Sequence, residues 1–383
     1  MNNDLNSNTP EKEIGFPPIS IPVLQYSSND FLFDLADQES VERSELNPKK
    51  TFKSLLRERW EMARAEGAFN YNLNCVYRNL GGDFNMDMQL NVDRGELRRK
   101  PLKFEHIKEP FDSTQWNFTK LLPKEILFYL KSTDTPNEED CSTEHIVAVN
   151  ASPLERDHSL IVPSVNKCYP QVLTPTAIQL GVDVMLMVDD IDFNILFNSV
   201  LGQASVNHLH LHCLYWPYKS DLIYRKFSKL GNSEVYVIEP PKWLCQAFAF
   251  QLKSKDDYQQ FNKNLTCCTK LLSDAGQAHN IFMTRAPTIR TDGPDWEKDA
   301  GDSQPSFVTA YVFPRKNMIG AKPPTNFNPA ANELAGCLTS YTKEFYETAN
   351  EAMCVSIIRE EATLSEQVFR ELSQSLQNHL NSS

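Results

Sequence analysis

The stretch GQASVNHLHLHCLYWP, residues 202–217, decides the fold. At its centre three histidines alternate with two leucines, in the order His208, Leu209, His210, Leu211 and His212. The β-branched and aromatic residues on both sides favour a strand. Side chains two residues apart in a strand leave the same face about 6.6 Å from one another, so the histidines share one face and the leucines the other. We therefore expect a buried strand that turns three imidazoles toward one cleft.

Two roles of this triplet other than catalysis are open. A purely structural role is disfavoured, because each buried imidazole needs hydrogen-bond partners at both ring nitrogens. Zinc is the stronger rival, since neutral imidazole is a common zinc ligand. On a flat strand, however, the Cα atoms of His208 and His212 lie about 13 Å apart, and no nearby Asp, Glu or Cys pattern completes a site.

The third role is nucleophilic catalysis at phosphorus by the central imidazole. A histidine is substantially neutral near pH 7 and forms a phosphoramidate that a second acceptor opens, which divides one difficult displacement into two steps. The flanking histidines then orient the central ring and donate hydrogen bonds to phosphate oxygens and the leaving group. The residues alone favour this chemistry.

Length, charge and cysteine content limit the other possibilities. A chain of 383 residues can form two ordinary domains that share a large core. Its formal net charge of −12 argues against broad nucleic-acid binding. No signal peptide and no apolar run of membrane-spanning length is recognisable. Nine cysteines without C-x-x-C spacing are typical of reduced thiols, so we expect a cytoplasmic protein with no membrane partner.

The chain before the histidines predicts an α+β unit. Residues 1–28, rich in Asn, Pro and Ser, are expected to lack fixed structure, and the first ordered element is expected near Phe31. Apolar spacing then predicts a helix over 52–65, strands over 146–150 and 159–163, a helix over 174–184 and a strand over 192–200. This order describes an antiparallel sheet with a helix on one face. Between residues 85 and 100 we expect a strand followed by a basic turn that holds Arg94, Arg98, Arg99 and Lys100, either as a solvated charge cluster or as a phosphate contact.

The rest of the chain repeats this outline without a second histidine triplet. We expect strands over 280–284 and 307–314, a loop over 285–306, and a long helix over 329–350. A final helix is expected to open at Thr363 with Glu366 in capping-box spacing, and its apolar stripe is Leu364, Val368, Leu372 and Leu376. The resulting division is a tail (1–28), a catalytic half (29–228), a second half (229–378) and a short end (379–383).

The stretch SVNHLHLH, residues 205–212, resembles the signature of the histidine triad superfamily. Within it the chain is most similar to the GDP-D-glucose phosphorylase family, which is related to GDP-L-galactose phosphorylases and galactose-1-phosphate uridylyltransferases. Further blocks match in the same order: RRKP (98–101), FDSTQWNFTKL (111–121), VNASPLERDHSLIVP (149–163), FNILFNSVLGQ (193–203), AHNIFMTR (278–285) and VFPRK (312–316). The resemblance implies two histidine-triad-like halves, as in the uridylyltransferases.

The resemblance also implies roles for single residues. His210 would attack the α-phosphorus of a GDP-sugar, become guanylylated and expel a sugar 1-phosphate, after which inorganic phosphate would release GDP. His208 would orient His210 through its carbonyl group, while His212 and Ser205 would contact the phosphate and the leaving group.

Other positions are weaker candidates for substrate binding. Asn150 stands where small triad proteins have an acidic residue that binds ribose hydroxyls, a role that an uncharged amide fills only in part. His158 matches a histidine near the site, and Asn198, Gln203, Arg94 and Arg98 are candidates for phosphate contact.

One departure from the pattern concerns the acceptor. The uridylyltransferase branch and plant GDP-L-galactose phosphorylase have glutamine at the third triad position, where this chain has His212. Histidine there is typical of hydrolytic triad proteins, and it also favours D-glucose as the sugar. The expected reaction is phosphorolysis of GDP-glucose, with hydrolysis to GMP, GDP-L-galactose phosphorolysis and non-catalytic nucleotide binding as alternatives. The resemblance implies no cofactor and no obligatory metal, and it allows a homodimer.

Overall fold

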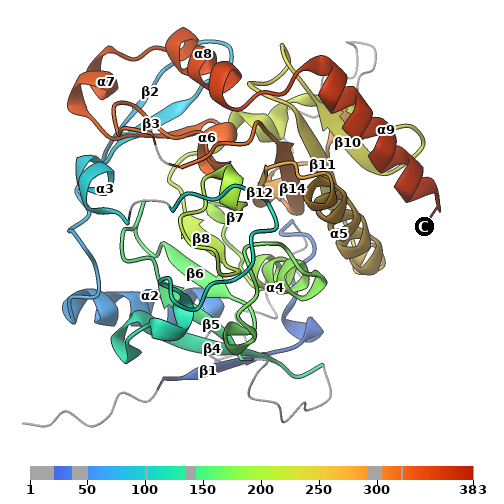
Figure 1. Cartoon of the computed structure of the whole chain (residues 1–383). Coiled ribbons are helices and arrows are strands. Elements are labelled where there is room, and N and C mark those ends of the chain that lie inside the picture. Colours follow the sequence, from blue (N-terminus) through green and yellow to red (C-terminus); the bar gives the residue numbers. More distant parts are fainter. Residues whose placement is uncertain are drawn as a thin grey trace, which may run out of the picture.

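A computed structural model describes residues 21–36, 51–99, 102–134, 144–291, 304–320 and 322–382. Within these residues the chain builds a twelve-stranded, mainly antiparallel sheet and a separate three-stranded sheet (Figure 1). The large sheet runs in the order β1 (Val23–Tyr26), β4 (Ile126–Ser132), β5 (His145–Val149), β6 (Ser159–Val162), β8 (Leu211–Tyr215), β7 (Phe193–Asn198), β12 (His279–Ala286), β14 (Phe307–Pro314), β11 (Ala247–Leu252), β10 (Val235–Ile238), β9 (Lys226–Lys229) and β13 (Arg290–Thr291). The predicted α+β class is confirmed.

Strands β7 and β12 join the two halves of the chain into one sheet. They pair antiparallel with Asn198 opposite Asn280, so the last strand before the histidines lies beside a strand of the second half. Helices α4 (Pro175–Leu186), α5 (Tyr258–Asp274) and α9 (Glu366–Ser382) share one large apolar core with this sheet (Figure 1). The core is therefore continuous across the halves.

The small sheet places a distant segment next to the predicted basic turn. It is formed by β15 (Cys337–Ser340), β3 (Asp87–Leu90) and β2 (Val76–Asn79). β15 pairs parallel with β3, with Cys337 opposite Asp87 and Ser340 opposite Leu90. Because the pair is parallel, α3 (Val92–Leu97), which follows β3, and α6 (Ala331–Leu334), which precedes β15, lie at opposite ends of it, and the residue after β15, Tyr341, lies on the α3 side.

Several predicted elements occur where their patterns placed them. The helix over 52–65 is α2 (Phe52–Ala65), capped by Thr51, and its predicted apolar positions are all buried: Phe52, Leu55, Leu56, Trp60 and Ala63. Thr174 caps α4, and Pro175 occupies its first turn, where a missing N–H does no harm. The strands predicted over 146–150, 159–163, 192–200, 280–284 and 307–314 are β5, β6, β7, β12 and β14.

The strand predicted across the histidines is shorter than expected. β8 begins at Leu211, so His208 and His210 precede it. Their segment hydrogen-bonds to a loop instead of a strand: Leu209 N–H donates to the Tyr169 carbonyl (2.8 Å), and the Gln171 side chain bonds both backbone groups of His210. Leu209 and Leu211 are buried in the core as predicted.

Three predictions near the N-terminus are wrong in detail. β1 and the short turn Ser28–Asp30 come before Phe31, because β1 pairs parallel with β4 and forms the edge of the large sheet. Residues 1–20, the rest of the predicted tail, lie outside the described residues. The basic turn is largely helical, since α3 is capped by Asn91 and carries Arg94. Lys100 lies outside the described residues.

The long helix predicted over 329–350 is wrong. That segment contains the single turn α6, the strand β15 and the helix α7 (Lys343–Thr348), followed by α8 (Glu351–Glu361). Gly336 has a φ of 90°, a left-handed conformation that ends the helical turn and allows residues 337–340 to join β3. The helical periodicity of residues 329–350 gave the wrong prediction, because residues 337–340 pair with β3 instead of continuing a helix.

The final helix begins three residues later than predicted. Ser365, not Thr363, caps α9 through its side chain, which accepts the N–H of Val368. The helix turns Phe369, Leu372 and Leu376 into the core and leaves Val368 exposed. It continues to Ser382, so the segment expected as a tail from residue 379 is helical to that point. In the predicted loop over 285–306, β12 reaches Ala286 and β13 forms, while residues 292–303 lie outside the described residues.

Candidate active site

The ring of His210 is held in one tautomer by its own backbone neighbourhood. Its Nδ1 lies 2.8 Å from the carbonyl oxygen of His208. A carbonyl only accepts, so Nδ1 must carry the proton and donate it. In the neutral ring the other nitrogen, Nε2, then keeps a free lone pair. His210 is therefore arranged to act as a nucleophile through Nε2.

His212 is held in the opposite tautomer by a relay through His158. The Leu154 N–H donates to Nδ1 of His158 (2.8 Å), so a neutral His158 carries its proton on Nε2. This Nε2 lies 3.0 Å from Nδ1 of His212 and donates to it. His212 must then carry its own proton on Nε2. Two neighbouring rings, with centroids 5.1 Å apart, thus offer a lone pair and an N–H donor respectively.

Burial keeps these rings neutral. It lowers the pKa of His208 and of His210 to about 4. It also holds the pKa of His158 and of His212 well below the ordinary value. Nearby charge adds to this effect, because Arg94 disfavours protonation of both His158 and His212. At pH 7 the tautomers described above are therefore the relevant forms.

Gln171 fixes the backbone of His210. Its Oε1 accepts the His210 N–H (2.8 Å), and its Nε2 donates to the carbonyl groups of His210 (3.0 Å) and Asn198 (2.9 Å). The side chain is buried and takes the place of a paired strand at the point where the ladder between β7 and β8 ends. Gln171 is therefore a positioning residue that the sequence patterns did not identify.

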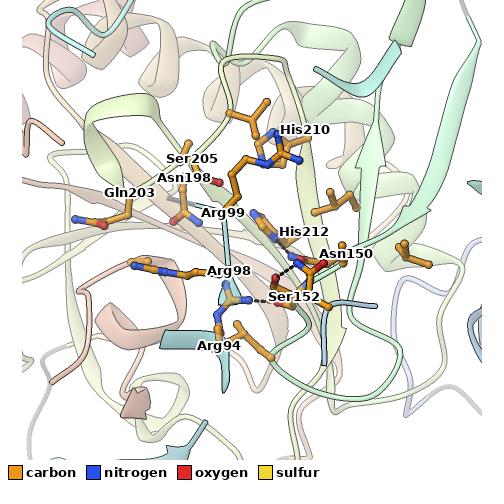
Figure 2. A pocket seen from close by; sticks show the side chains of 18 of the residues that line it. Arg94, Arg98, Arg99, Asn150, Ser152, Asn198, Gln203, Ser205, His210 and His212 are labelled. Carbon is orange, nitrogen blue, oxygen red and sulfur yellow. Dashed lines mark hydrogen bonds between the residues drawn. The ribbon is translucent and has the colours of Figure 1, made fainter. Parts of the chain in front are cut away.

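His210 and His212 line a cavity of about 470 Å³ between the two halves (Figure 2). Eight of the ten predicted site residues line it: Arg94, Arg98, Asn150, Asn198, Gln203, Ser205, His210 and His212. The other two, His158 and His208, are buried behind it. Nδ1 of His208 accepts the N–H of Phe118 (3.1 Å), and the ring packs against Phe111 and Phe118.

Asn150 lies between the histidines and the arginine side of the cavity. Its Oδ1 accepts the N–H of Ser152 (3.0 Å), and its Nδ2 lies 3.5 Å from Nδ1 of His212 (Figure 2). The Ser152 carbonyl in turn accepts a hydrogen bond from the guanidinium of Arg94. Asn150 is therefore part of the network that sets the histidine rings.

Contacts with the second half of the chain hold two of the predicted site residues, Asn198 and Gln203. Oδ1 of Asn198 accepts from Nδ2 of Asn280 (2.6 Å) and from the Ala331 N–H (3.0 Å), which ties β7 to α6. Gln203 has a φ of 84° and contacts the sulfur of Met318. Both side chains therefore reach the cavity from positions held by the second half of the chain.

Three arginines enter the cavity from α3 and its C-terminal end. Arg98 stacks on the ring of Tyr341 (4.9 Å to the centroid) and donates to its hydroxyl (3.2 Å). Arg99 stacks on Trp116 at 3.7 Å. Figure 2 shows Arg94 and Arg98 reaching in below Gln203 and Asn198. The arginines for which a phosphate contact is predicted thus line the same cavity as the histidines.

The second half supplies a wall that sequence patterns did not predict. Its lining residues are Asn328, Ala330, Asn332, Glu333 and Tyr341. Burial raises the pKa of Glu333 to about 7, and the positive charges of Arg94 and Arg98 act against that rise. These residues lie near the arginines because β15 pairs with β3. Trp116 and Phe118, which line the opposite end, belong to the block at 111–121 that carries the family resemblance.

The described residues contain neither a candidate metal site nor a candidate membrane-spanning helix. Among these residues no group of three or more His, Cys, Asp or Glu side chains could hold a metal ion. None of the helices within the described ranges is both long enough and apolar enough to cross a membrane.

Comparisons with known proteins agree with this arrangement. The model of the GDPGP1-like N-terminal domain matches residues 51–214, and that of the GDPGP1-like C-terminal domain matches residues 220–383. GDP-D-glucose phosphorylase 1 of Caenorhabditis elegans is 57% identical over 361 residues, which cover 92% of this chain and 75% of that protein. The protein of the same name from Danio rerio is 35% identical over 343 residues, covering 88% and 93% of the two chains.

A solved structure shares the fold at low sequence identity. The crystal structure of yeast Ap4A phosphorylase Apa2 superposes with a TM-score of 0.57 at 14% identity, covering 83% of this chain and 97% of that one. The chain therefore shares the fold of that phosphorylase. With both domain models matched across residues 51–383, the chain belongs to the GDPGP1-like family of nucleotidyl-transferring enzymes.

Proposed function

We propose that this protein is a GDP-D-glucose phosphorylase, which converts GDP-glucose and inorganic phosphate to GDP and glucose 1-phosphate through a guanylyl-histidine at His210. The observation that carries the proposal is the pair of opposite tautomers: His210 with a free lone pair on Nε2, and His212 with an N–H donor on Nε2. The relatives from C. elegans and D. rerio, which match this chain over 361 and 343 residues, carry that name.

The first step is attack of His210 Nε2 on the α-phosphorus of GDP-glucose. The bond between the α-phosphorus and the bridging oxygen breaks, and glucose 1-phosphate leaves with the electron pair. The ring of His210 becomes cationic, and its remaining N–H stays bonded to the His208 carbonyl, which stabilises that charge. The N–H of His212 and the hydroxyl of Ser205 are placed to bond phosphate oxygens at the same cavity wall.

The second step returns the enzyme to its resting state. An oxygen of inorganic phosphate attacks the guanylyl phosphorus, the P–N bond breaks, and GDP leaves with His210 neutral again. Arg94 and Arg98 supply the positive charge that a phosphate or a sugar phosphate needs in this cavity. Asn150, Asn198 and Gln203 supply further polar contacts along the same surface.

Three finer points belong to the proposal. The eight cysteines within the described ranges are free thiols, which supports a cytoplasmic location. The homodimer rests on the family resemblance alone, and sedimentation of the purified protein tests it. The division of the chain at residues 228 and 229 is likewise a prediction, which limited proteolysis tests.

Product analysis tests the reaction. Purified protein given GDP-glucose should produce GDP and glucose 1-phosphate only when phosphate is present. Quenching the reaction without phosphate should yield a labelled peptide that contains His210. GMP as the main product in the presence of phosphate would instead identify a hydrolase, and tight GDP binding with no turnover of any GDP-sugar would identify a non-catalytic binding protein.

A further inference from the structure

The cavity has two chemically different ends with the histidines between them. At one end Phe118 and Trp116 provide aromatic surface, and the Phe118 ring lies 5.0 Å from the ring of His210. Leu121, Leu160 and Val206 extend this apolar surface. At the other end the lining is polar and comes from α3 and the α6 segment. Arg99 stacks on Trp116 at 3.7 Å and also lines this end. A nucleotide base stacks on flat apolar rings or on a planar guanidinium, so it fits the first end.

Polar contacts connect the histidines to the second end: Nδ2 of Asn150 lies 3.5 Å from Nδ1 of His212, its Oδ1 accepts the Ser152 N–H, and the Ser152 carbonyl accepts from Arg94. Phe118 contacts His210, and His210 contacts His212. The positive charge of Arg94 lowers the pKa of His212, and the charges of Arg94 and Arg98 lower the pKa of Glu333. Glu333 lines the cavity near these arginines. A GDP-sugar bound with its base at the aromatic end and its β-phosphate at the arginines brings its sugar to the Glu333 wall.

Glu333 is a buried carboxylate that its surroundings satisfy only in part. It is 3% exposed; its Oε2 accepts the Ala330 N–H (3.2 Å), and the backbone N–H of Glu333 itself also bonds the carboxylate. Within the described ranges it forms no ion pair. Asn332 beside it is 2% exposed; its Nδ2 bonds the Cys337 carbonyl, and its Oδ1 has no hydrogen-bond partner among the described residues. Both line the cavity, so acceptors without sufficient donors meet at its polar end.

The segment that carries Glu333 is held firmly by the rest of the protein. The Ala331 N–H donates to Oδ1 of Asn198 on β7 (3.0 Å), and the guanidinium of buried Arg315 bonds the Pro329 carbonyl. A fixed acceptor discriminates between ligands better than a mobile one, because it cannot move to suit a different arrangement of donors.

We propose that Glu333, supported by Asn332, binds hydroxyl groups of the hexose and determines which GDP-hexose the enzyme accepts. This inference rests on the proposed function. Sugar hydroxyls are the donors that a carboxylate and a free amide acceptor need, and hydrogen bonds to a charged group are stronger than those to a neutral one. A hexose with one hydroxyl inverted would leave a buried acceptor unpaired, which is the strongest available basis for rejecting it.

Two donors with the same nucleotide separate this role from others. GDP-glucose carries the hexose, whereas the β-methyl ester of GDP carries a methyl group and no sugar hydroxyl. Replacement Glu333→Gln should lower kcat/KM for GDP-glucose by about 10- to 100-fold, and should leave kcat/KM for the methyl ester within about threefold. Glu333→Gln should also reduce the preference for GDP-glucose over GDP-hexoses with one inverted hydroxyl.

The control is Glu361→Gln. Glu361 is on α8, pairs with Lys322 (2.6 Å) and does not line the cavity, so this variant should match the unmodified protein with both donors. An equal loss on both donors in Glu333→Gln would overturn the inference, since Glu333 would then serve the guanine or the arginines. No loss on GDP-glucose would also overturn it. Failure of the unmodified protein to transfer guanylyl from either donor would instead overturn the proposed function.

Discussion

The two walls of the cavity differ in charge and in the part of the chain that forms them. They also differ in the direction in which burial shifts the pKa values of their side chains. The histidine wall comes from one short segment of the first half, and its rings are neutral because burial lowers their pKa values. The opposite wall joins arginines of α3 to Glu333, about 240 residues later in the chain, and there burial raises the pKa of the carboxyl group to about 7.

This difference assigns the walls to different tasks. A neutral ring with a fixed tautomer is suited to bond making, because its lone pair is available without removal of a proton. Fixed charges and unpaired acceptors are suited to holding a charged, hydroxyl-rich group in one orientation. We therefore propose that bond making depends on the histidine wall and that the choice of substrate depends on the charged wall.

The largest effect should come from the nucleophile. Replacement His210→Asn removes the ring nitrogen that becomes bonded to phosphorus, and kcat should fall by at least about 10³-fold. GDP affinity by calorimetry should change far less. His106→Asn, at an exposed histidine outside the cavity, should have unchanged kcat. Retention of most of the activity by His210→Asn would show that the two walls are not divided in this way.

The charged wall should give the next largest effect. Arg94→Met removes a cation from the region assigned to the phosphate, so kcat/KM should fall by about 10²- to 10³-fold. The KM for phosphate should rise as well, and Arg94→Lys should recover part of the loss. Arg156→Met is the matched control, because Arg156 is exposed and pairs with Glu61 outside the cavity. Equal activity of Arg94→Met and Arg156→Met would show that Arg94 has no role in binding the phosphate.

A smaller effect should follow from loosening the support of the histidine wall. Gln171→Leu keeps the size of the side chain but loses the three hydrogen bonds that it makes to the backbone of His210 and Asn198. We expect kcat to fall by about 10- to 100-fold with KM nearly constant, since a displaced nucleophile slows bond making more than binding. The measured kcat of each protein should be divided by the fraction of molecules that become guanylylated, so that only active molecules are counted. A normal rate per active molecule would make Gln171 only a stabilising residue.

The same division explains what the sequence could predict. The histidine wall could be predicted from the sequence because its motif is local. Eight consecutive residues contain all three rings, and the leucines between them are buried in the core. Helix α2 and strand β14 were accessible for the same reason, as each carries its own apolar pattern. Even so, the strand across His208 and His210 was wrong, because a side chain from a loop, Gln171, replaced the neighbouring strand.

The charged wall could be predicted from the sequence only in part. A run of arginines suggested a phosphate contact, but nothing local to Glu333 distinguishes it from the other acidic residues of the chain. Its place depends on the parallel pairing of β15 with β3, which the periodicity of residues 329–350 hid by suggesting a helix. Contacts between segments so far apart are decided by tertiary packing and leave no pattern in either segment.

The pH dependence of guanylylation should separate the walls. Since burial lowers the pKa of His210 to about 4, the ring stays neutral on acidification past the ordinary histidine value. In Glu333→Gln, the rate of guanylylation without phosphate should therefore stay nearly constant from pH 8 to 6 and fall only below about pH 5.5. The unmodified protein should show an added step near pH 7. A loss centred near pH 6.5 in the variant would contradict a buried neutral nucleophile.

Stability should respond to pH in opposite directions at the two walls. For the histidines, unfolded rings take up protons near pH 6.5 while folded ones resist, so stability is lost on acidification from about pH 6.5 toward 4. For Glu333 the folded pKa is the higher one, about 7 against an ordinary 4.5, so stability is lost as pH rises through that interval. Glu333→Gln removes only the second effect.

Urea unfolding of the ligand-free protein at pH 5 and pH 8 measures this contrast. Relative to the unmodified protein, Glu333→Gln should gain about 2 to 3 kcal/mol more stability at pH 8 than at pH 5, from a pKa difference worth about 1.4 kcal/mol per unit. The histidine contribution is common to both proteins and cancels in the comparison. The same gain at both pH values would show that Glu333 is not held with a raised pKa. A gain confined to pH 8 would mean that the unmodified protein keeps a destabilising carboxylate, as expected for a group retained for binding.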